Sequence, residues 1–355
     1  MNLSEFDYHL PEDRIAQQPQ ADRAASRMLV VDRASGKWED HAFRELPSYL
    51  REGDCLVLND SKVFPSRLLG RRAGVRALSV GKKNPARWQH LTGRVEVFLL
   101  HPIGEDNRTW LALVHPGRKM HLGERVRFSD TLEAEVLARG AFGERTVRFK
   151  CEGDIYERLN ETGHVPLPPY IKRPDSLEDR ERYQTVFARE KGSVAAPTAG
   201  LHFTPEMLEA CRAAGADTAF VTLHVGLGTF QPVLEEAIEE HKIHPEWFRI
   251  DAANAAKMYD ARRIVAVGTT SVRTIETAMQ QGGLSECNGS TDLYIYPGFE
   301  FCATGAMLTN FHLPRSSLLF LVCAFAGKEL ILDAYRHAVE AGYRFYSYGD
   351  CMLIV

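Results

Sequence analysis

The stretch RVEVFLLHPIGEDNRTWLALVHPG, residues 94–117, decides much of the fold. It holds two short runs rich in Val, Leu and Phe, VEVFLL and TWLALV, with turn residues between them. Further short runs follow in RVRF (125–128), LEAEVLA (132–138) and TVRF (146–149). Because strands this dense leave no room for helices between them, residues 93–150 are predicted to form a small antiparallel barrel or sandwich.

On both sides of this stretch, strand and helix patterns alternate, which is typical of the α/β class. We expect an α/β-barrel-like main domain formed by both chain ends, 1–62 and 154–355, with an antiparallel β-barrel, 63–153, inserted between them. In the C-terminal part, the predicted strands are 218–225, 263–268, 292–297 and 306–311, and the predicted helices are 205–214, 232–241, 252–262, 270–281 and 328–341.

Length and composition are those of an ordinary globular protein. The chain has 355 residues, of which 45% are hydrophobic and 25% are charged. This composition excludes collagen-like, intrinsically disordered and disulfide-scaffold proteins. The length is sufficient for two domains, each with its own core.

Basic residues are concentrated in one segment. Residues 61–95 contain nine Lys and Arg side chains and no acidic one, although the whole chain carries a net charge of −4. A phosphate backbone is a natural partner for such a segment, because each neutralised phosphate releases counterions. A solvated loop is the alternative interpretation.

Cysteine usage and the absence of apolar segments predict a cytoplasmic protein. The seven cysteines are widely spaced and include no C-x-x-C pair, which fits reduced thiols. The N-terminal sequence MNLSEFDYHLPEDR lacks the apolar core of a signal peptide. The longest apolar run, residues 318–327, is too short to span a bilayer, so no membrane contact is expected.

Three polar, Gly- or Pro-rich loops at predicted strand or helix ends carry histidines. VAAPTAGLHFT (194–204) leads into a helix with Thr204 as its N-cap and contains His202. His224 precedes the G-x-G of LHVGLGTFQP, and His312 lies in MLTNFHLPRSS. If the domain is an α/β barrel, such ends converge on one ligand-binding face. A capped loop, a tight turn and packed histidines are the alternatives for the separate motifs.

Three further motifs bear on the kind of ligand that the protein binds. VGTTSVRTIE (267–276) places hydroxyls at a helix start, where a carboxylate or phosphate can bind. The G-x-G at 226–228 lacks the third glycine of a dinucleotide fingerprint, so NAD is disfavoured. EEHKIHPE (239–246) contains metal-ligand types, but its H-x-x-H spacing does not share a helix face and Pro245 breaks the helix. No metal site is therefore predicted.

Taken together, VAAPTAGLHFT, LHVGLGTFQPV, TNFHLPRSSLL (309–319) and YRFYSYGD (343–350) closely resemble the S-adenosylmethionine:tRNA ribosyltransferase-isomerases of queuosine biosynthesis. FDYHLPEDRIAQQP (6–19), GDCLVLNDSKVFPSRLLG (53–70), PLPPYIKR (166–173) and RYQTVFA (182–188) extend the resemblance over the whole chain. These motifs are long and specific.

The resemblance implies an enzyme that transfers the ribosyl part of S-adenosylmethionine to 7-aminomethyl-7-deazaguanine at the tRNA wobble position. The ribose rearranges during transfer, giving epoxyqueuosine-tRNA, and adenine and methionine are released. The resemblance also implies a monomer with an α/β barrel and an inserted β-barrel. S-adenosylmethionine would be a consumed substrate, and no cofactor would be required.

Residue chemistry suggests roles within the matching motifs. His202 or His312 would transfer protons, because neutral imidazole can act as acid or base near pH 7. Glu276 or Asp350 would orient a histidine or face the sulfonium charge. The S-adenosylmethionine pocket would be formed by Pro197, Thr198, Gly200, Phe203, His224, Gly226, Gly228, Thr229, Thr270, Ser271, Arg273 and Asn310.

Contacts with tRNA are predicted in and beside the basic segment. The sequence departs from the family pattern here, because the basic stretch 71–90 is longer than the usual linker; it also has Gly305 where an Asp is usual. An RNA methyltransferase and a non-catalytic RNA-binding protein are the alternative functions. The residues predicted to contact tRNA are Lys62, Arg67, Arg71, Arg72, Lys82, Lys83 and Arg94.

Overall fold

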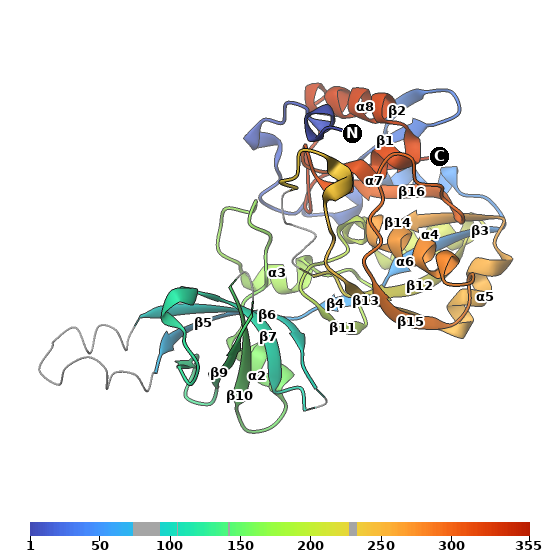
Figure 1. The fold of residues 1–355 in the computed structure, drawn as a ribbon. Coiled ribbons are helices and arrows are strands. Elements are labelled where there is room, and N and C mark those ends of the chain that lie inside the picture. Colours follow the sequence, from blue (N-terminus) through green and yellow to red (C-terminus); the bar gives the residue numbers. More distant parts are fainter. Residues whose placement is uncertain (74–92, 105, 141–142, 227–232) are drawn as a thin grey trace, which may run out of the picture. The chain divides into compact units, whose positions relative to one another are not determined.

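The structure, a computed structural model, divides the chain into two compact units (Figure 1). It describes residues 1–73, 93–104, 106–140, 143–226 and 233–355. The main unit contains Met1–Lys62, Pro168–Pro174 and Glu178–Val355. The second unit contains Val63–Leu167 and Asp175–Leu177. Both chain termini therefore belong to the main unit.

The main unit is built on a nine-stranded mixed sheet in the order β15-β13-β12-β3-β14-β16-β17-β1-β2. The four strands β12, β3, β14 and β16 are parallel, whereas β13, β15 and β2 pair antiparallel with their neighbours. The strands are β1 (Arg27–Asp32), β2 (Lys37–Ala42), β3 (Asp54–Asn59), β12 (Asp217–Leu223), β13 (Glu246–Ile250), β14 (Arg263–Val267), β15 (Cys287–Thr291), β16 (Thr304–Asn310) and β17 (Cys351–Ile354).

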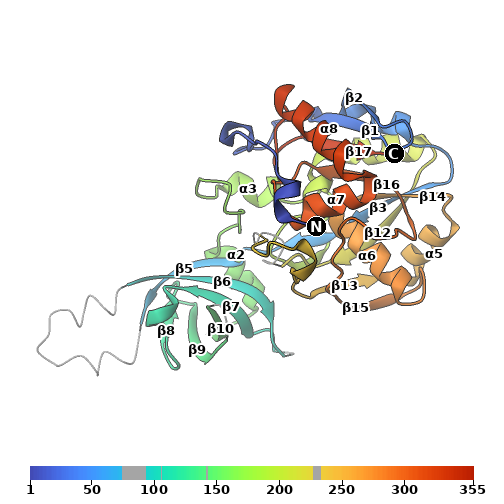
Figure 2. The ribbon, with the colours of Figure 1, turned by 45° about the horizontal axis from the view of Figure 1, so that its top comes forward.

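Helices cover both faces of this sheet, because its buried strands alternate between two apolar clusters. In β3, Cys55 and Val57 face one cluster, while Leu56 and Leu58 face the other. The first face is covered by α5 (Ala252–Asp260), α6 (Thr269–Gln280), α7 (Ser317–Ala326) and α8 (Lys328–Glu340), of which α7 and α8 are red in Figure 2. The second is covered by 3-10 turns η4 (Phe43–Tyr49) and η7 (Thr198–His202) and by α4 (Pro205–Ala213).

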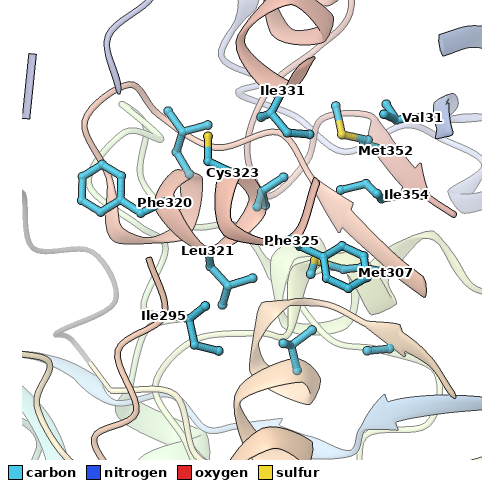
Figure 3. Packing of buried hydrophobic residues seen from close by; sticks show 14 of the residues in the cluster. Val31, Ile295, Met307, Phe320, Leu321, Cys323, Phe325, Ile331, Met352 and Ile354 are labelled. Carbon is cyan, nitrogen blue, oxygen red and sulfur yellow. The ribbon is translucent and has the colours of Figure 1, made fainter. Parts of the chain in front are cut away.

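Helix α7 is the most apolar of the helices that cover the first face. Its sequence SLLFLVCAFA is apolar on nearly every side, and Phe325 lies next to Met307 of β16 (Figure 3). A helix that is apolar all round must be buried. Ser316 caps its start and Gly327, at φ 93°, ends it, which a residue with a Cβ adopts only with strain. The apolar run at 318–327 is therefore a core helix.

The α/β class and the inserted antiparallel barrel are confirmed, and the main sheet is of the open kind. Its outer strands β15 and β2 each pair with a single neighbour among the described residues. Both edges end in antiparallel strands, so the repeated parallel strands that close an α/β barrel are interrupted there. The main domain is thus a layered α/β structure with helices on two faces.

Most predicted elements of the C-terminal part are present, and two are not. Residues 292–297 are not a strand; the strand is the preceding Cys287–Thr291, which pairs with β13, while Ile295 packs into the core. The predicted helix 232–241 is, within its described residues 233–241, only the 3-10 turn Ile238–Glu240. The main chain of this segment bonds the N-terminal segment instead, with Leu3 N–H donating to Glu236 O at 2.8 Å.

The second unit is a closed six-stranded antiparallel barrel in the order β10-β7-β6-β5-β8-β9. Its apolar side chains alternate along each strand and fill the interior, as Val95, Val97 and Leu99 do in β6. Gly70 allows close packing, because a Cβ there would lie 2.6 Å from Val126 Cγ1. The strands are β5 (Arg67–Arg72), β6 (Arg94–Pro102), β7 (Thr109–His115), β8 (Arg125–Arg127), β9 (Glu133–Arg139) and β10 (Glu144–Lys150).

This compact unit continues past residue 153, the expected end of the insert, to Leu167. Helix α2 (Ile155–Thr162) packs on the barrel, with Tyr156 5.9 Å from the ring of Trp110. The chain then pairs with β5, where Arg67 and His164 exchange main-chain hydrogen bonds. The remaining elements are α3 (Leu177–Arg182) and a two-stranded sheet of β4 (Ser61–Val63) and β11 (Glu190–Ser193).

Candidate active site

Three segments meet beside the carboxyl ends of β14 and β16, on the face covered by η7. Gly268, which follows β14, donates its N–H to Leu308 O at 2.7 Å. A Cβ on Gly268 would lie 3.5 Å from the Cβ of Ala199 in η7. The carboxyl ends of parallel strands are where open α/β sheets bind ligands. This end of the main sheet is therefore the candidate active site.

His202 ends η7 and is the most suitable proton-transfer group of this site. Its side chain is buried, its Nδ1 lies 2.8 Å from Ser26 Oγ, and its ring packs on Phe43. The single Ser26 hydroxyl proton can go to Arg23 O, at 3.4 Å, or to His202 Nδ1, so this contact is compatible with either tautomer of His202. The Nε2 of His202 has no hydrogen-bond partner among the described residues.

Burial keeps His202 neutral. Desolvation lowers the pKa of His202 to about 4, and the nearby side chain of Asn310 opposes this shift only in part. The imidazole is thus uncharged at pH 7. A neutral imidazole with a free Nε2 can accept a proton from a bound substrate.

Asn310, the last residue of β16, supplies a second polar atom beside His202. Its Nδ2 donates to Tyr346 O at 2.9 Å, while its buried Oδ1 has no partner among the described residues. Tyr346 has a φ of 72°, a left-handed conformation that is strained for a tyrosine. Strain of this kind persists where surrounding contacts enforce it, often at functional sites.

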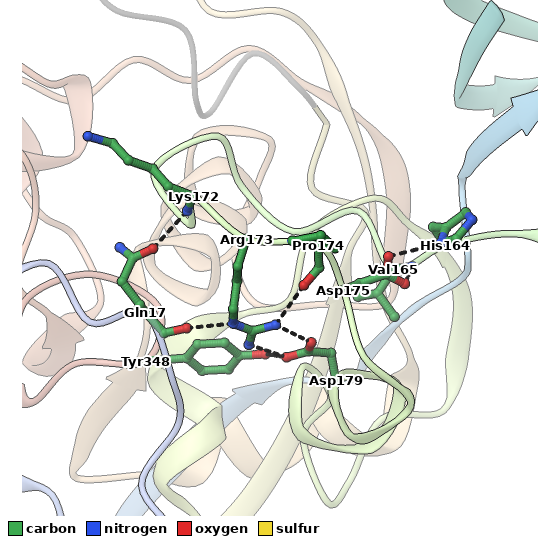
Figure 4. Close-up of polar contacts among 9 residues, drawn as sticks. All are labelled: Gln17, His164, Val165, Lys172, Arg173, Pro174, Asp175, Asp179 and Tyr348. Atoms are coloured by element: carbon green, nitrogen blue, oxygen red, sulfur yellow. Dashed lines mark hydrogen bonds and ion pairs between the residues drawn. The ribbon is translucent and has the colours of Figure 1, made fainter. Parts of the chain in front are cut away.

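Contacts from the N-terminal and central segments hold the strained turn in place (Figure 4). Tyr348 donates to Asp179 Oδ1 at 2.8 Å, and Arg173 binds the same carboxylate through both Nη atoms at 2.6 and 2.8 Å. The Nε of Arg173 donates to Gln17 O at 2.9 Å. Three of the motifs quoted above, 6–19, 166–173 and 343–350, therefore meet in one buried polar network.

His312 does not join His202, which corrects the expectation that three histidines converge on one face. Its Nε2 lies 2.9 Å from Thr309 Oγ1, and its N–H donates to Tyr335 Oη at 3.2 Å. Tyr8 donates to its carbonyl oxygen. Tyr8 and Tyr335 belong to the α7–α8 cluster, whereas His202 packs with Phe43 on the other face. Burial lowers the pKa of His312 to about 3.

His224 lies at the end of β12, beside β11. Its ring stacks on Trp247 at 5.0 Å, and a Cβ on Gly192 would lie 2.7 Å from its Nε2. Burial lowers its pKa to about 4, and its buried Nδ1 has no partner among the described residues. It is a packed neutral histidine with one nitrogen available.

The G-x-G motif is anchored by a buried ion pair. Gly226 N–H donates to Glu246 Oε1 at 2.7 Å, and Arg273 Nη1 pairs with Glu246 Oε2. The Nε of Arg273 donates to Leu293 O at 3.0 Å, which leaves its buried Nη2 without a partner among the described residues. The Nη2 of Arg273 thus has two N–H donors to offer a ligand. Gly228 and Thr229 lie outside the described residues.

The carboxylates of Glu276 and Asp350 hold the main chain and do not orient a histidine. Glu276 accepts from Cys302, Ala303 and Thr304 N–H and from Thr304 Oγ1 at 2.6 to 3.3 Å. Asp350 accepts from the N–H groups of Arg27 and Arg344 at 2.9 and 2.8 Å, and burial raises its pKa. Both side chains serve as main-chain acceptors here and contact no histidine among the described residues, and the roles predicted for them beside the substrate stay predictions.

The other residues predicted to form the pocket differ in whether their polar atoms already have a hydrogen-bond partner. The buried Thr270 Oγ1 has no partner among the described residues, whereas Ser271 Oγ donates at 2.8 Å to the O of Val267, the last residue of β14. Phe203 is fully buried against Phe43 and is a core residue. Pro197 and Thr198 begin η7. A Cβ on Gly200 would lie 2.8 Å from Phe187 Cζ, so that only glycine fits.

Sequence reasoning missed the partners that these residues recruit. Ser26 is 176 residues from His202 in the chain and has no distinguishing motif. The sequence pattern suggests only a metal-ligand role for Glu246, whereas in the structure it pairs with Arg273. Tyr346 lies in a quoted motif, but its left-handed φ has no sequence signal. In the described part of the chain, no three His, Cys, Asp or Glu side chains are placed to hold a metal ion.

In the second unit, the arginines predicted to contact tRNA are of two kinds: two are paired with glutamates, and two are exposed. Arg67 binds both oxygens of Glu96, at 2.9 and 3.1 Å, and Arg72 binds both oxygens of buried Glu124. Arg71 and Arg94 are exposed. Lys62 is half-buried in β4 of the main unit, while Lys82 and Lys83 lie outside the described residues. Among the described helices, none is long and apolar enough to cross a membrane.

Comparison with known proteins gives consistent matches over the full length. The family model described as queuosine biosynthesis protein matches residues 3–354. An S-adenosylmethionine:tRNA ribosyltransferase-isomerase from Solibacter usitatus is 69% identical over 355 residues, covering 100% of both chains. One from Thermoanaerobacter sp. is 47% identical, again covering 100% of both. The crystal structure of S-adenosylmethionine tRNA ribosyltransferase from Thermotoga maritima matches with a TM-score of 0.55 and 37% identity, covering 99% of this chain and 100% of that one.

Proposed function

The chain belongs to the queuosine biosynthesis family, and we propose that it acts on S-adenosylmethionine and tRNA as an S-adenosylmethionine:tRNA ribosyltransferase-isomerase. It transfers the ribosyl moiety of S-adenosylmethionine to 7-aminomethyl-7-deazaguanine at the wobble position. The ribose is isomerised to an epoxycyclopentanediol, which gives epoxyqueuosine-tRNA. Adenine and methionine leave as products.

This reaction needs a base in a dry site, and His202 meets that need best. The carbon beside the sulfonium bears the most acidic C–H of the ribose, and a neutral imidazole can remove its proton. His202 has the unpartnered Nε2 and the low pKa that this step requires, and its contact with Ser26 allows the tautomer with the lone pair on Nε2. This buried, uncharged Nε2 is the observation that supports the catalytic assignment most directly.

Neighbouring groups would bind the substrate around that base. Asn310 Oδ1 and Thr270 Oγ1 are buried and free to bond polar groups of the ribose or adenine. The free Nη2 of Arg273 would donate to the methionine carboxylate, to which arginine binds strongly. Gly226, fixed by Glu246, would allow close approach of the ligand to the main chain.

His312 fits a supporting role in this scheme. Its Nε2 is taken by Thr309, and its main chain is fixed by two tyrosine hydroxyls. It therefore stabilises the loop that follows Asn310. His224, which has one free ring nitrogen, stays a candidate ligand contact.

S-adenosylmethionine is consumed in this proposal, and no further cofactor or metal takes part in the reaction. The enzyme would work as a monomer in the cytoplasm. All seven cysteines are free thiols, which supports a reducing compartment.

Product analysis tests the proposal. The protein is incubated with S-adenosylmethionine and with tRNA carrying the aminomethyl-deazaguanine, and the digested nucleosides are weighed by mass spectrometry. We expect epoxyqueuosine in the tRNA, together with one free adenine for each modified nucleoside. A methylated nucleoside with intact adenosylhomocysteine would instead identify an RNA methyltransferase. tRNA binding without either product would identify a non-catalytic RNA-binding protein.

A further inference from the structure

Three arginines form a row across adjacent strands of the barrel. Arg71 of β5 lies directly opposite Arg94 of β6 on one side and opposite Arg127 of β8 on the other. Directly opposite residues of antiparallel strands point to the same face, with their Cβ atoms about 5 Å apart. All three side chains are exposed, whereas their neighbours Val95 and Val126 point into the barrel. The row therefore lies on the outer face.

Within the described part of the chain, the charges of this row have few acidic partners. Other arginines on the same strands have close carboxylate partners: Arg67 with Glu96 and Arg72 with Glu124. In contrast, Arg71 and Arg94 form no ion pair within the described residues, and Arg127 lies 3.9 Å from Glu133, which also binds Arg125. Like charges directly opposite one another destabilise a sheet. A row of this kind is costly unless an anion occupies it.

A cavity of about 690 Å³ opens along the row. Arg71, Arg94 and Arg127 all line it, together with His115 and Ser129, which can donate hydrogen bonds. Glu96 and Asp130 are the acidic residues at its border, and Glu96 is already held by Arg67. The cavity thus presents three guanidinium groups, one from each of the adjacent strands β6, β5 and β8, to an elongated ligand that crosses these strands.

We propose that the Arg94–Arg71–Arg127 row binds the phosphodiester backbone of the tRNA substrate. Guanidinium groups bind phosphate oxygens in pairs of hydrogen bonds, and a row of them matches successive phosphates better than a single small anion. Arg71 and Arg94 also flank residues 74–92, a stretch that adds four basic side chains and no acid to the sequence. This inference rests on the proposed function, because that function supplies tRNA as the partner.

The proposal separates the predicted tRNA contacts into two groups. Arg67 and Arg72 hold carboxylates of the barrel and serve its structure. Arg127, which is far from the basic segment in the sequence, joins Arg71 and Arg94 only through strand pairing. The row supplies affinity that does not depend on the base sequence, because phosphates are common to all nucleotides.

The test compares two triple variants of matched charge. One replaces the row, Arg71→Gln, Arg94→Gln and Arg127→Gln. The control replaces three exposed arginines of the main unit, Arg44→Gln, Arg212→Gln and Arg336→Gln. The dissociation constant for tRNA is measured at several salt concentrations, without S-adenosylmethionine. A third protein with lysine at the three row positions keeps the charge.

We expect the glutamine row variant to bind tRNA at least about tenfold more weakly and to lower the slope of log K against log salt by about 2 to 3. In the control triple variant and in the lysine variant, the slope of log K against log salt should stay close to that of the wild type. S-adenosylmethionine binding, measured without tRNA, stays within about twofold of wild type, because none of the substituted residues is among those predicted to form its pocket.

An unchanged tRNA affinity and salt slope in the glutamine row variant would overturn the proposal. So would an equal loss in the lysine variant, because a phosphate contact depends on charge. Polyglutamate, an acidic polypeptide, serves as a second ligand in the same assay. If the glutamine row variant loses binding to polyglutamate while its tRNA binding is unchanged, the row binds an acidic protein partner and the proposal is overturned. These binding measurements need no turnover, so their failure is distinguishable from failure of the wild-type enzyme to release adenine.

Discussion

Arg273 and Glu246 form an ion pair from which water is almost excluded, with side-chain exposures of 5% and 4%. The same carboxylate accepts the N–H of Gly226 at 2.7 Å, so the pair joins α6, β13 and the G-x-G motif. A buried charge is tolerated only while its partner is present. This relationship makes the motif dependent on two residues that follow it in the chain.

Replacing Glu246 should therefore destabilise the protein strongly. Glu246→Ala leaves the Arg273 guanidinium buried without its counterion, and we expect the free energy of unfolding to fall by about 3–5 kcal/mol. Urea denaturation followed by circular dichroism measures this change. Glu209→Ala, which removes an exposed partner of Arg212, is the control and should cost less than about 1 kcal/mol. Similar losses in the two variants would contradict the buried pair.

His202 and His312 should respond differently to substitution. His202→Gln removes the free Nε2 beside Asn310, and kcat for adenine release should fall by about 10²–10⁴-fold, the usual contribution of a general base. His312→Gln should lower stability with a much smaller effect on kcat, because its Nε2 is bonded to Thr309. Normal turnover by both variants would remove the histidines from the mechanism.

Stability should fall in mild acid because three histidines are buried uncharged. Burial lowers the pKa of His202 and His224 from 6.5 to about 4, and that of His312 to about 3. The unfolded chain binds these protons first, so the stabilisation is complete above pH 6.5 and is lost as the pH falls towards 4. Each histidine contributes up to about 1.4 kcal/mol per pH unit in that range.

Urea midpoints measured at pH 7, 6, 5 and 4.5 check this dependence. Burial raises the pKa of Asp350, which has the opposite effect on stability near the acidic end of this range. The double variant His202→Gln, His312→Gln should show a shallower decline between pH 6.5 and 5 than the wild type. If the urea midpoint of the wild type did not change between pH 7 and pH 4.5, these histidines would be hydrated in the folded protein and the prediction would be wrong.

Gly200 should be intolerant of a methyl group. In Gly200→Ala the new Cβ would approach Phe187 Cζ and Thr185 Cγ2 at 2.8 Å, which forces η7 and with it His202 to move. We expect a loss of about 1–3 kcal/mol in stability together with reduced kcat. Gly93→Ala is the control for crowding, because its new Cβ would meet no described residue within 4 Å. Full activity of Gly200→Ala would mean that η7 adjusts without moving the histidine.

Neighbouring arginines of β5 should show opposite effects on stability. Arg71→Gln removes a charge that faces Arg94 and Arg127, and we expect a higher Tm, corresponding to about 0.2–1 kcal/mol. Arg72→Gln leaves the fully buried Glu124 without its cation and should lower Tm. Thermal unfolding without RNA measures both. A lower Tm for Arg71→Gln would show that the row is stabilised within the protein itself.

The local patterns of the sequence determined the kinds of elements and the family. Short runs rich in Val, Leu and Phe, such as VEVFLL and TWLALV, with turn residues between them predicted the barrel strands, and in the structure one face of each strand fills the interior. The helices at 205–214, 252–262, 270–281 and 328–341 were found because a 3.6-residue period and their capping residues are local properties. The quoted motifs identified the family because each is a contiguous string.

Only the tertiary structure decided which of these residues work together. His202 and His312 carry the same chemistry in the sequence, yet the chain places them on opposite faces of one sheet, with Ser26 beside one and Tyr8 and Tyr335 beside the other. Glu276 and Asp350 became main-chain acceptors because the backbone that they hold comes from distant segments. Strand register brought Arg127 to Arg71. Such pairings depend on long-range packing, which has no local signal in the sequence.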